Sequence, residues 1–154
     1  MKTVNQWLEE YGESHKNETN KTIHWICVPA IFFSIVGLLF SIKLPWILYS
    51  HTINVAIIAI LLITVYYLRL SLALGFGMLL FGIGCLFLCH LIEMFVPVSL
   101  WLICVIIFAA AWVGQFYGHS VEGKKPSFLK DIQFLLIGPM WLISFIYKKI
   151  GIQF

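Results

Sequence analysis

Four long runs without charge constrain the fold of this 154-residue chain more than any other sequence feature. No Asp, Glu, Lys or Arg occurs in residues 22–42, 44–68, 70–92 or 94–121. A helix needs roughly 20 apolar residues to cross the hydrocarbon core of a bilayer, so each run predicts a transmembrane helix. A membrane β-barrel would need residues that alternate between apolar and polar, and the runs lack this alternation.

The two ends of the chain predict two further segments. The run 132–147 is short and has Gly138-Pro139 in its middle, which predicts a re-entrant or interfacial segment or, alternatively, a fifth span. Near the N-terminus Thr3 and Gln6 can form a capping box. Apolar side chains and one histidine then recur at helical spacing, which predicts an amphipathic helix on the membrane surface: Val4, Trp7, Leu8, Tyr11 and His15.

We therefore expect a single integral membrane domain, residues 1–154, with an all-α fold. It is a polytopic bundle of four transmembrane helices with an amphipathic N-terminal helix and a C-terminal re-entrant or fifth segment. A composition of 61% hydrophobic and 11% charged residues excludes an ordinary soluble domain and a disordered chain. The net charge of +3, without a long basic cluster, gives no reason to expect nucleic-acid binding. A homo-oligomer is compatible with the sequence.

The basic residues predict the orientation in the membrane. With four spans and a re-entrant last segment, nine of the ten Lys and Arg residues lie on the N-terminal side, and only Lys43 lies opposite. Basic residues favour the cytoplasmic side. We expect a cytoplasmic N-terminus, in a bacterial inner membrane or an endoplasmic reticulum membrane.

Three of the five histidines are predicted at the cytoplasmic face. His15 follows the surface helix, His24 opens the first span and His119 closes the fourth, and an even number of crossings separates them. His51 and His90 are expected near the opposite face, as interfacial or packed side chains. Polar side chains within a membrane tend to mark function.

The end of the fourth span has a further pattern. Gln115, His119 and Glu122 are spaced i, i+4 and i+7, so they share one helix face. His119 and Glu122 can present an imidazole and a carboxylate to one metal ion. Gly114 and Gly118 form a G-x-x-x-G motif, which allows a neighbouring helix to approach closely.

His15 and His24 can meet only if the helix breaks between them. Nine residues of unbroken helix would place them on opposite faces. The polar segment 16–20 supplies the break, and Asn20 is a suitable N-cap for the first span. His15, His24, His119 and Glu122 then form a candidate metal site, with Asn20 and Gln115 as hydrogen-bonding neighbours.

The residue types leave the metal open. Imidazole and carboxylate suit non-haem Fe(II), and zinc is the main rival. His24 and His119 could also hold a haem, and a metal-free hydrogen-bonded cluster is a further alternative. The four cysteines lie inside apolar runs without a CxxC pattern, so we expect them to be packed small side chains.

At these residues the sequence resembles a known family. The segment 11–15 reads YGESH and is followed by Asn20, His24 and Pro29, while 112–119 reads WVGQFYGH and is followed by Glu122 and Lys124. Both resemble motifs of the yeast-type 2-hydroxy fatty acid dioxygenases, small multi-span proteins of fatty acid α-oxidation. Some positions depart from the family pattern: Cys27 stands where glycine is expected, Ser127 replaces alanine, and Phe145 occupies about the place of a glutamate.

The resemblance implies an Fe(II)-dependent dioxygenase that shortens a 2-hydroxy fatty acid by one carbon with O2, without 2-oxoglutarate. It implies that His15, His24 and His119 hold the iron, with Glu122 as a fourth ligand or as a partner that orients a histidine. The substrate would enter from the membrane lipid. The absence of the glutamate at Phe145 puts the activity in question. Another metal-dependent lipid hydroxylase or hydrolase, or a non-enzymatic membrane assembly protein, remains the alternative.

Overall fold

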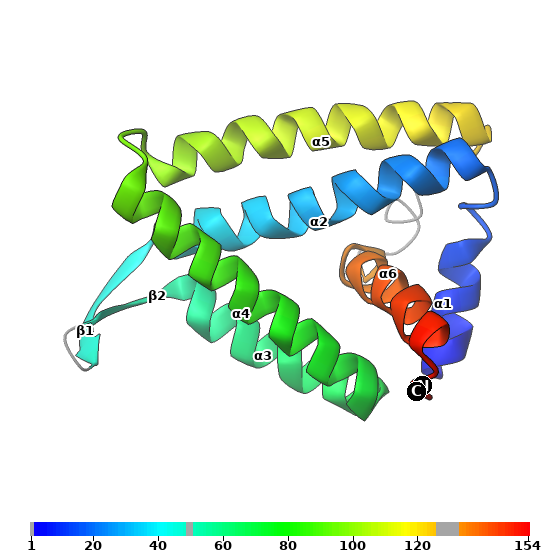
Figure 1. The fold of residues 1–154 in the computed structure, drawn as a ribbon, viewed down its shortest axis with the longest axis horizontal. Coiled ribbons are helices and arrows are strands. Elements are labelled where there is room, and N and C mark those ends of the chain that lie inside the picture. Colours follow the sequence, from blue (N-terminus) through cyan, green and yellow to red (C-terminus); the bar gives the residue numbers. More distant parts are fainter. Residues whose placement is uncertain (1, 49–50, 126–132) are drawn as a thin grey trace.

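The computed structural model describes residues 2–48, 51–125 and 133–154. Ser127 lies outside these ranges. Helices dominate the fold (Figure 1), and one short β-hairpin interrupts them. The elements, in chain order, are α1 (Val4–Gly12), α2 (Glu18–Phe40), β1 (Lys43–Leu48), β2 (His51–Asn54), α3 (Val55–Leu70), α4 (Leu72–Phe95), α5 (Leu100–Glu122) and α6 (Phe134–Ile150).

Three of the described helices are long and apolar enough to cross a membrane, namely α2, α4 and α5. Helix α3 is apolar but has only 16 residues. Helix α6 has 17 residues and continues through Pro139. The membrane character predicted from the sequence is therefore supported, whereas the count of four transmembrane helices plus a re-entrant segment is not confirmed.

The run 44–68 does not form one helix, in contrast to the prediction. Its first part pairs as the antiparallel strands β1 and β2, with Leu48 opposite His51. Pro45 has no N–H and is unfavourable in a helix interior. Asn54 then caps α3, because its side chain accepts a hydrogen bond from the Ile57 N–H. The helix consequently begins at Val55, about ten residues later than the charge pattern alone predicts.

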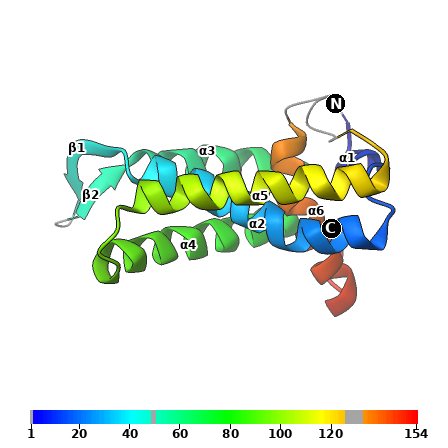
Figure 2. The same ribbon diagram turned by 90° about the horizontal axis from the view of Figure 1, so that it is seen from above.

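The helices are arranged as two antiparallel pairs and an end group. Helices α2 and α5 lie side by side along their length, and α3 and α4 form the second pair (Figures 1 and 2). Helices α1 and α6 pack at the end where α2 begins and α5 finishes. Chain segments near both termini therefore meet at one end of the bundle.

Helix α1 has the predicted cap and the predicted apolar face. The Thr3–Gln6 capping box is formed in both directions. The apolar face packs against α6, with Trp7 edge-on to Phe134 at 5.4 Å and Tyr11 5.3 Å from Trp141 between ring centroids. Part of the surface that we expected to contact lipid is thus covered by protein.

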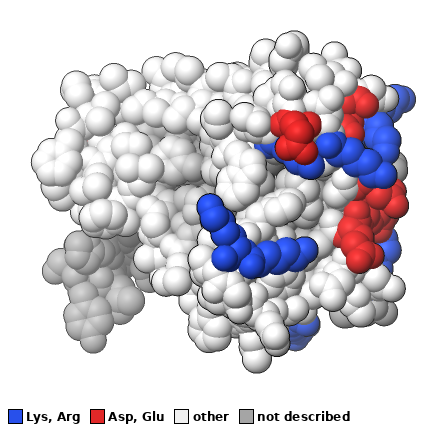
Figure 3. Space-filling view, turned by 45° about the vertical axis from the view of Figure 1, so that its right-hand side comes forward, with Lys and Arg blue, Asp and Glu red and all other residues white. Residues whose placement is uncertain are grey.

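The outer surface also fits a membrane environment. Large apolar side chains point outward, for example Leu80 and Val113, which are 69% and 71% exposed. Figure 3 shows charged atoms gathered on the side of the molecule formed by α1, α6 and the adjoining helix ends, beside broad uncharged surfaces. At the other end Lys43 pairs with Glu93 at 2.9 Å. Extended exposed apolar surface of this kind indicates contact with lipid.

The close contact between α2 and α5 requires small residues. A Cβ atom at Gly114 would lie 2.6 Å from the Cys27 sulfur, and one at Gly118 would collide with the Asn20 side-chain oxygen. The G-x-x-x-G motif therefore allows the approach that brings the end of α5 against the start of α2.

This packing predicts that Gly114→Val destabilises the protein by about 1–3 kcal/mol, through overpacking. Thermal unfolding in detergent measures the effect. Gly84→Val is the matched control, since no atom lies within 4 Å of a Cβ at Gly84. An equal loss of stability in both variants would show that helix propensity, and not contact with α2, explains the result.

Candidate metal centre

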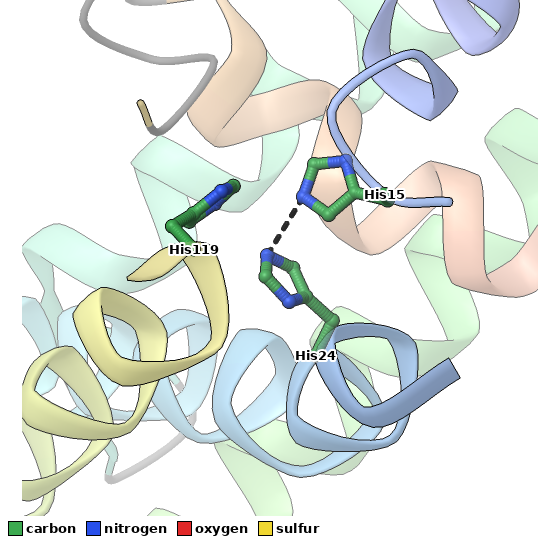
Figure 4. Close-up of side chains that lie close together, drawn as sticks. All are labelled: His15, His24 and His119. Atoms are coloured by element: carbon green, nitrogen blue, oxygen red, sulfur yellow. Dashed lines mark hydrogen bonds between the residues drawn. The ribbon is translucent and has the colours of Figure 1, made fainter. Parts of the chain in front are cut away.

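Three buried histidines from three parts of the chain meet at the end of the bundle. His15 comes from the turn after α1, His24 from the second turn of α2 and His119 from the last turn of α5. They are 1%, 1% and 4% exposed. Figure 4 shows the three rings around a common space, and one potential ligand atom from each lies within 4.8 Å of the others.

Backbone carbonyls fix the orientation of two of the rings. Nδ1 of His15 lies 2.6 Å from the Tyr11 carbonyl oxygen, and Nδ1 of His24 lies 2.9 Å from the Asn20 carbonyl oxygen. A carbonyl only accepts, so each Nδ1 carries the proton and donates it. In both neutral rings Nε2 is then an unprotonated lone-pair donor, which is the arrangement that prepares a histidine for a metal ion.

These two lone pairs face one another. The Nε2 atoms of His15 and His24 are 2.8 Å apart. Two unprotonated nitrogens at this distance repel unless a proton or a metal ion lies between them. Imidazole nitrogens bound at neighbouring positions of one ion, with bonds of about 2.0–2.1 Å, are roughly 3 Å apart. The donor set therefore fits a metal ion with little movement.

Burial keeps His15 neutral. Loss of solvent lowers the pKa of His15 to about 4, and this outweighs the hydrogen bond to Tyr11, which raises the pKa. The ring also stacks on Tyr11, with centroids 4.2 Å apart and an interplanar angle of 13°. At neutral pH His15 is thus an uncharged, rigidly held side chain that could serve as a ligand.

Glu122 lies beside the cluster and not within it. Its carboxylate oxygens accept hydrogen bonds from the backbone N–H groups of Lys16 and Asn17 at 3.0 and 2.7 Å, and from the Asn20 amide at 3.3 Å. Among the described residues, the group of potential ligands contains the three histidines but not Glu122. Of the two predicted roles, the geometry favours a partner that orients the segment carrying His15 over a fourth ligand.

The break between His15 and His24 is present, but its cap differs from the prediction. Asn17 caps α2, since its side chain accepts from the backbone N–H groups of Thr19 and Asn20. Asn20 is instead inside the helix and fully buried, and its amide donates to the Ser14 carbonyl as well as to Glu122. Asn17 satisfies the same rule for an N-cap and lies three residues earlier.

The cluster borders an apolar cavity of about 320 Å³. His119 and Gln115 contribute polar groups to its wall, and the lining comes mainly from α1, α2, α3, α5 and α6. The Gln115 Nε2 atom and the His119 Nδ1 atom are buried without a hydrogen-bond partner among the described residues. Polar groups in this state usually have a partner such as a ligand or water.

A second cavity, of about 370 Å³, borders His15. Charged side chains on its wall include Glu9, Lys16, Lys21 and Lys148. Phe145, where the family resemblance suggested a glutamate, also lines this cavity, so an aromatic ring occupies that place. The histidine cluster thus borders an apolar cavity through His119 and a charged one through His15.

Other polar residues considered from the sequence lie elsewhere. His90 is exposed on α4, outside the histidine cluster, and His51 is the first residue of β2. All four cysteines are buried and free, in agreement with the prediction that they pack as small side chains.

Comparison with known proteins agrees with this geometry. A family model described as "2-hydroxy-palmitic acid dioxygenase Mpo1-like" matches residues 1–150. The chain belongs to the Mpo1-like family. Among curated proteins, the Mpo1-like chain is 28% identical over 145 residues to the 2-hydroxy-palmitic acid dioxygenase MPO1 of Saccharomyces cerevisiae. The alignment covers 92% of this chain and 78% of the yeast protein. No solved structure matches this chain.

Sequence reasoning missed two parts of this Mpo1-like site. The sequence placed Tyr11 on the apolar face of α1 and in the YGESH motif but did not predict its contact with His15, although its carbonyl and ring both hold His15. The apolar cavity was also not foreseen, because its lining comes from five helices whose packing the sequence does not specify. The i to i+4 spacing from Tyr11 to His15 is the one signal that could have indicated the first contact.

The position of Glu122 predicts the behaviour of Glu122→Gln. In the variant an amide replaces the carboxylate, so one of the two oxygens becomes an NH2 group. The remaining oxygen can accept the hydrogen bond of one backbone N–H group, but the NH2 group then faces the other backbone N–H group. The turn carrying His15 should therefore loosen. Metal affinity is expected to fall about 10–100-fold, as for residues that orient ligands. At saturating metal, however, the stoichiometry should match wild type, as measured by metal titration.

Glu18→Gln is the control, because Glu18 lies in the same region and its exposed carboxylate pairs only with the Lys21 side chain among the described contacts. Loss of metal from Glu122→Gln even at saturation would instead identify Glu122 as a direct ligand.

Proposed function

We propose that this protein is an Fe(II)-dependent dioxygenase that shortens 2-hydroxy fatty acids by one carbon with O2. One observation carries the proposal: three buried imidazoles meet, two with their Nε2 lone pairs facing each other at 2.8 Å, and the third, His119, lines a cavity suited to an acyl chain. The family and the name of the yeast relative support the same reaction class.

The residues fit an iron ion. His15, His24 and His119 would hold it, and three imidazoles leave coordination positions open for substrate and O2. Bound iron would supply the redox centre and a template for the 2-hydroxy acid. The protein contributes orientation, because carbonyl groups fix two rings, and exclusion of water, because all three histidines are buried.

The apolar cavity has the length of an acyl chain. Its lining extends along α2 from Val28 to Leu39, which corresponds to about 16 Å of helix. The hydrocarbon core of a bilayer is about 30 Å thick and contains two opposed chains, so one chain spans roughly half of it. An acyl tail can therefore lie beside α2 with its polar end at His119.

The charged cavity that borders His15 suits the polar end of the substrate. Lys16, Lys21 and Lys148 can attract a carboxylate to the site. We propose that this side faces the cytoplasm, in line with the distribution of basic residues.

The reaction balances without a further reductant. A 2-hydroxy acid and one O2 yield the acid shortened by one carbon, carbon dioxide and water. The substrate loses four electrons, as its C2 carbon becomes a carboxyl group and its carboxyl carbon becomes carbon dioxide, and O2 accepts all four. This stoichiometry agrees with a site that needs no 2-oxoglutarate.

The metal assignment predicts one iron ion per chain after anaerobic reconstitution, measured by elemental analysis. His24→Asn should lose the iron and the uptake of O2 with 2-hydroxypalmitate, since the variant retains a polar side chain but lacks the imidazole. His90→Asn is the matched control and should behave as wild type, because His90 is exposed and outside the cluster. Iron retention by His24→Asn, or zinc-dependent activity without O2 uptake, would contradict the proposal.

The cavity also predicts control of chain length. Ala59 on α3 lines the cavity together with α2 residues as far along as Leu39, so Ala59→Phe should shorten the available space. Activity towards 2-hydroxypalmitate is expected to fall about tenfold or more, as one or two methylenes already change selectivity 10–200-fold. Activity towards 2-hydroxyoctanoate should be retained.

The chain-length preference is measured by product analysis with a series of 2-hydroxy acids of different length. Ala110→Phe serves as the control, because Ala110 is exposed on α5 and is not part of the cavity lining. An unchanged length preference in Ala59→Phe would place the acyl chain elsewhere.

A further inference from the structure

The Gln115 amide is an unusual group in the wall of the apolar cavity. The residue is only 5% exposed, and its Nε2 atom has no hydrogen-bond partner among the described residues. It lies one helical turn before His119 on α5, and both residues line the same cavity. Its neighbours in the lining include the apolar side chains of Val28 and Ile31.

A buried amide without a partner destabilises a protein, and an apolar residue would pack at this position without that cost. A water molecule could satisfy the amide only with two or more further polar partners. In the same lining, the His119 Nδ1 atom is also buried without a partner in the described chain. An oxygen atom of a bound ligand, which would accept a hydrogen bond from the amide, explains this buried group better than a water molecule does.

The position of Gln115 indicates which oxygen this is. Four residues of helix correspond to about 6 Å along α5, so Gln115 lies farther from the end of α5 than the candidate metal ligand His119. The charged carboxylate belongs with the metal and with the charged cavity that borders His15. The next polar group along the substrate towards its tail is the hydroxyl on C2.

We propose that Gln115 recognises the 2-hydroxyl group and so selects 2-hydroxy acids over ordinary fatty acids. The inference rests on the proposed function, and it adds the residue that decides between two substrates with the same tail and carboxylate. A site built to hydrogen-bond a hydroxyl group rejects the analogue that lacks it, because its own buried polar group then remains unpaired. Gln115 is a specificity-determining residue in this account, and the histidines hold the metal.

Gln115→Met tests the proposal, because methionine has a similar length and volume but no hydrogen-bonding amide. The measurement is equilibrium binding of 2-hydroxypalmitate and palmitate to the Fe(II)-loaded protein without O2, so turnover does not interfere. Wild type should bind 2-hydroxypalmitate about tenfold or more tightly than palmitate. The variant should bind the two acids with nearly equal affinity, through weaker binding of 2-hydroxypalmitate and unchanged or tighter binding of palmitate.

Two further variants make the test specific. Gln115→Leu should give the same result with a different apolar side chain. Phe116→Met, at an exposed neighbouring position of α5, should keep the preference of wild type. Iron content, measured in every protein, should remain at one ion per chain.

The outcomes separate this inference from the proposed function. If wild type prefers 2-hydroxypalmitate and Gln115→Met retains the preference, Gln115 does not recognise the hydroxyl group. An equal loss of affinity for both acids in the variant would also overturn the assignment, since it would indicate a general role in the cavity. Failure of wild type to bind either acid would contradict the proposed function itself.

Discussion

The arrangement of the site depends on the contact between the Nε2 atoms of His15 and His24. Each ring donates its Nδ1 proton to a backbone carbonyl, so the two unprotonated nitrogens are held toward each other at 2.8 Å. Without a cation between them this arrangement is repulsive, and with a metal ion it becomes two ligands of one centre. The buried position of both rings makes the requirement for a cation stronger, because water cannot screen the lone pairs.

Helix packing and one carboxylate bring these rings together. The glycines of α5 allow contact with α2 near Cys27 and Asn20, which places His119 beside His24. Glu122, three residues after His119, then binds the backbone at Lys16 and Asn17 and so holds the turn after His15. The same helix end therefore supplies one histidine and positions another. The candidate centre borders two cavities, one suited to an acyl tail and one suited to a charged group.

The sequence predicted the features that depend on local pattern. The charge-free runs located most of the helices, the Thr3–Gln6 box marked the start of α1, and the polar segment after His15 marked the break that lets His15 meet His24. Features that depend on a choice between two equally suitable residues, or on how distant segments pack, were not predictable. Two asparagines both suited the cap of α2, and Asn17 was used. The hairpin at Pro45, and the cavity formed by five helices, required knowledge of which segments pack together.

X-ray absorption at the iron edge of the Fe(II)-loaded protein tests the central claim most directly, because the multiple scattering of imidazole rings reports how many histidines bind the metal. The account predicts three imidazole nitrogens at about 2.1 Å, together with oxygen ligands at the open positions. A spectrum with one imidazole or none, in protein that holds a full complement of iron, would contradict it.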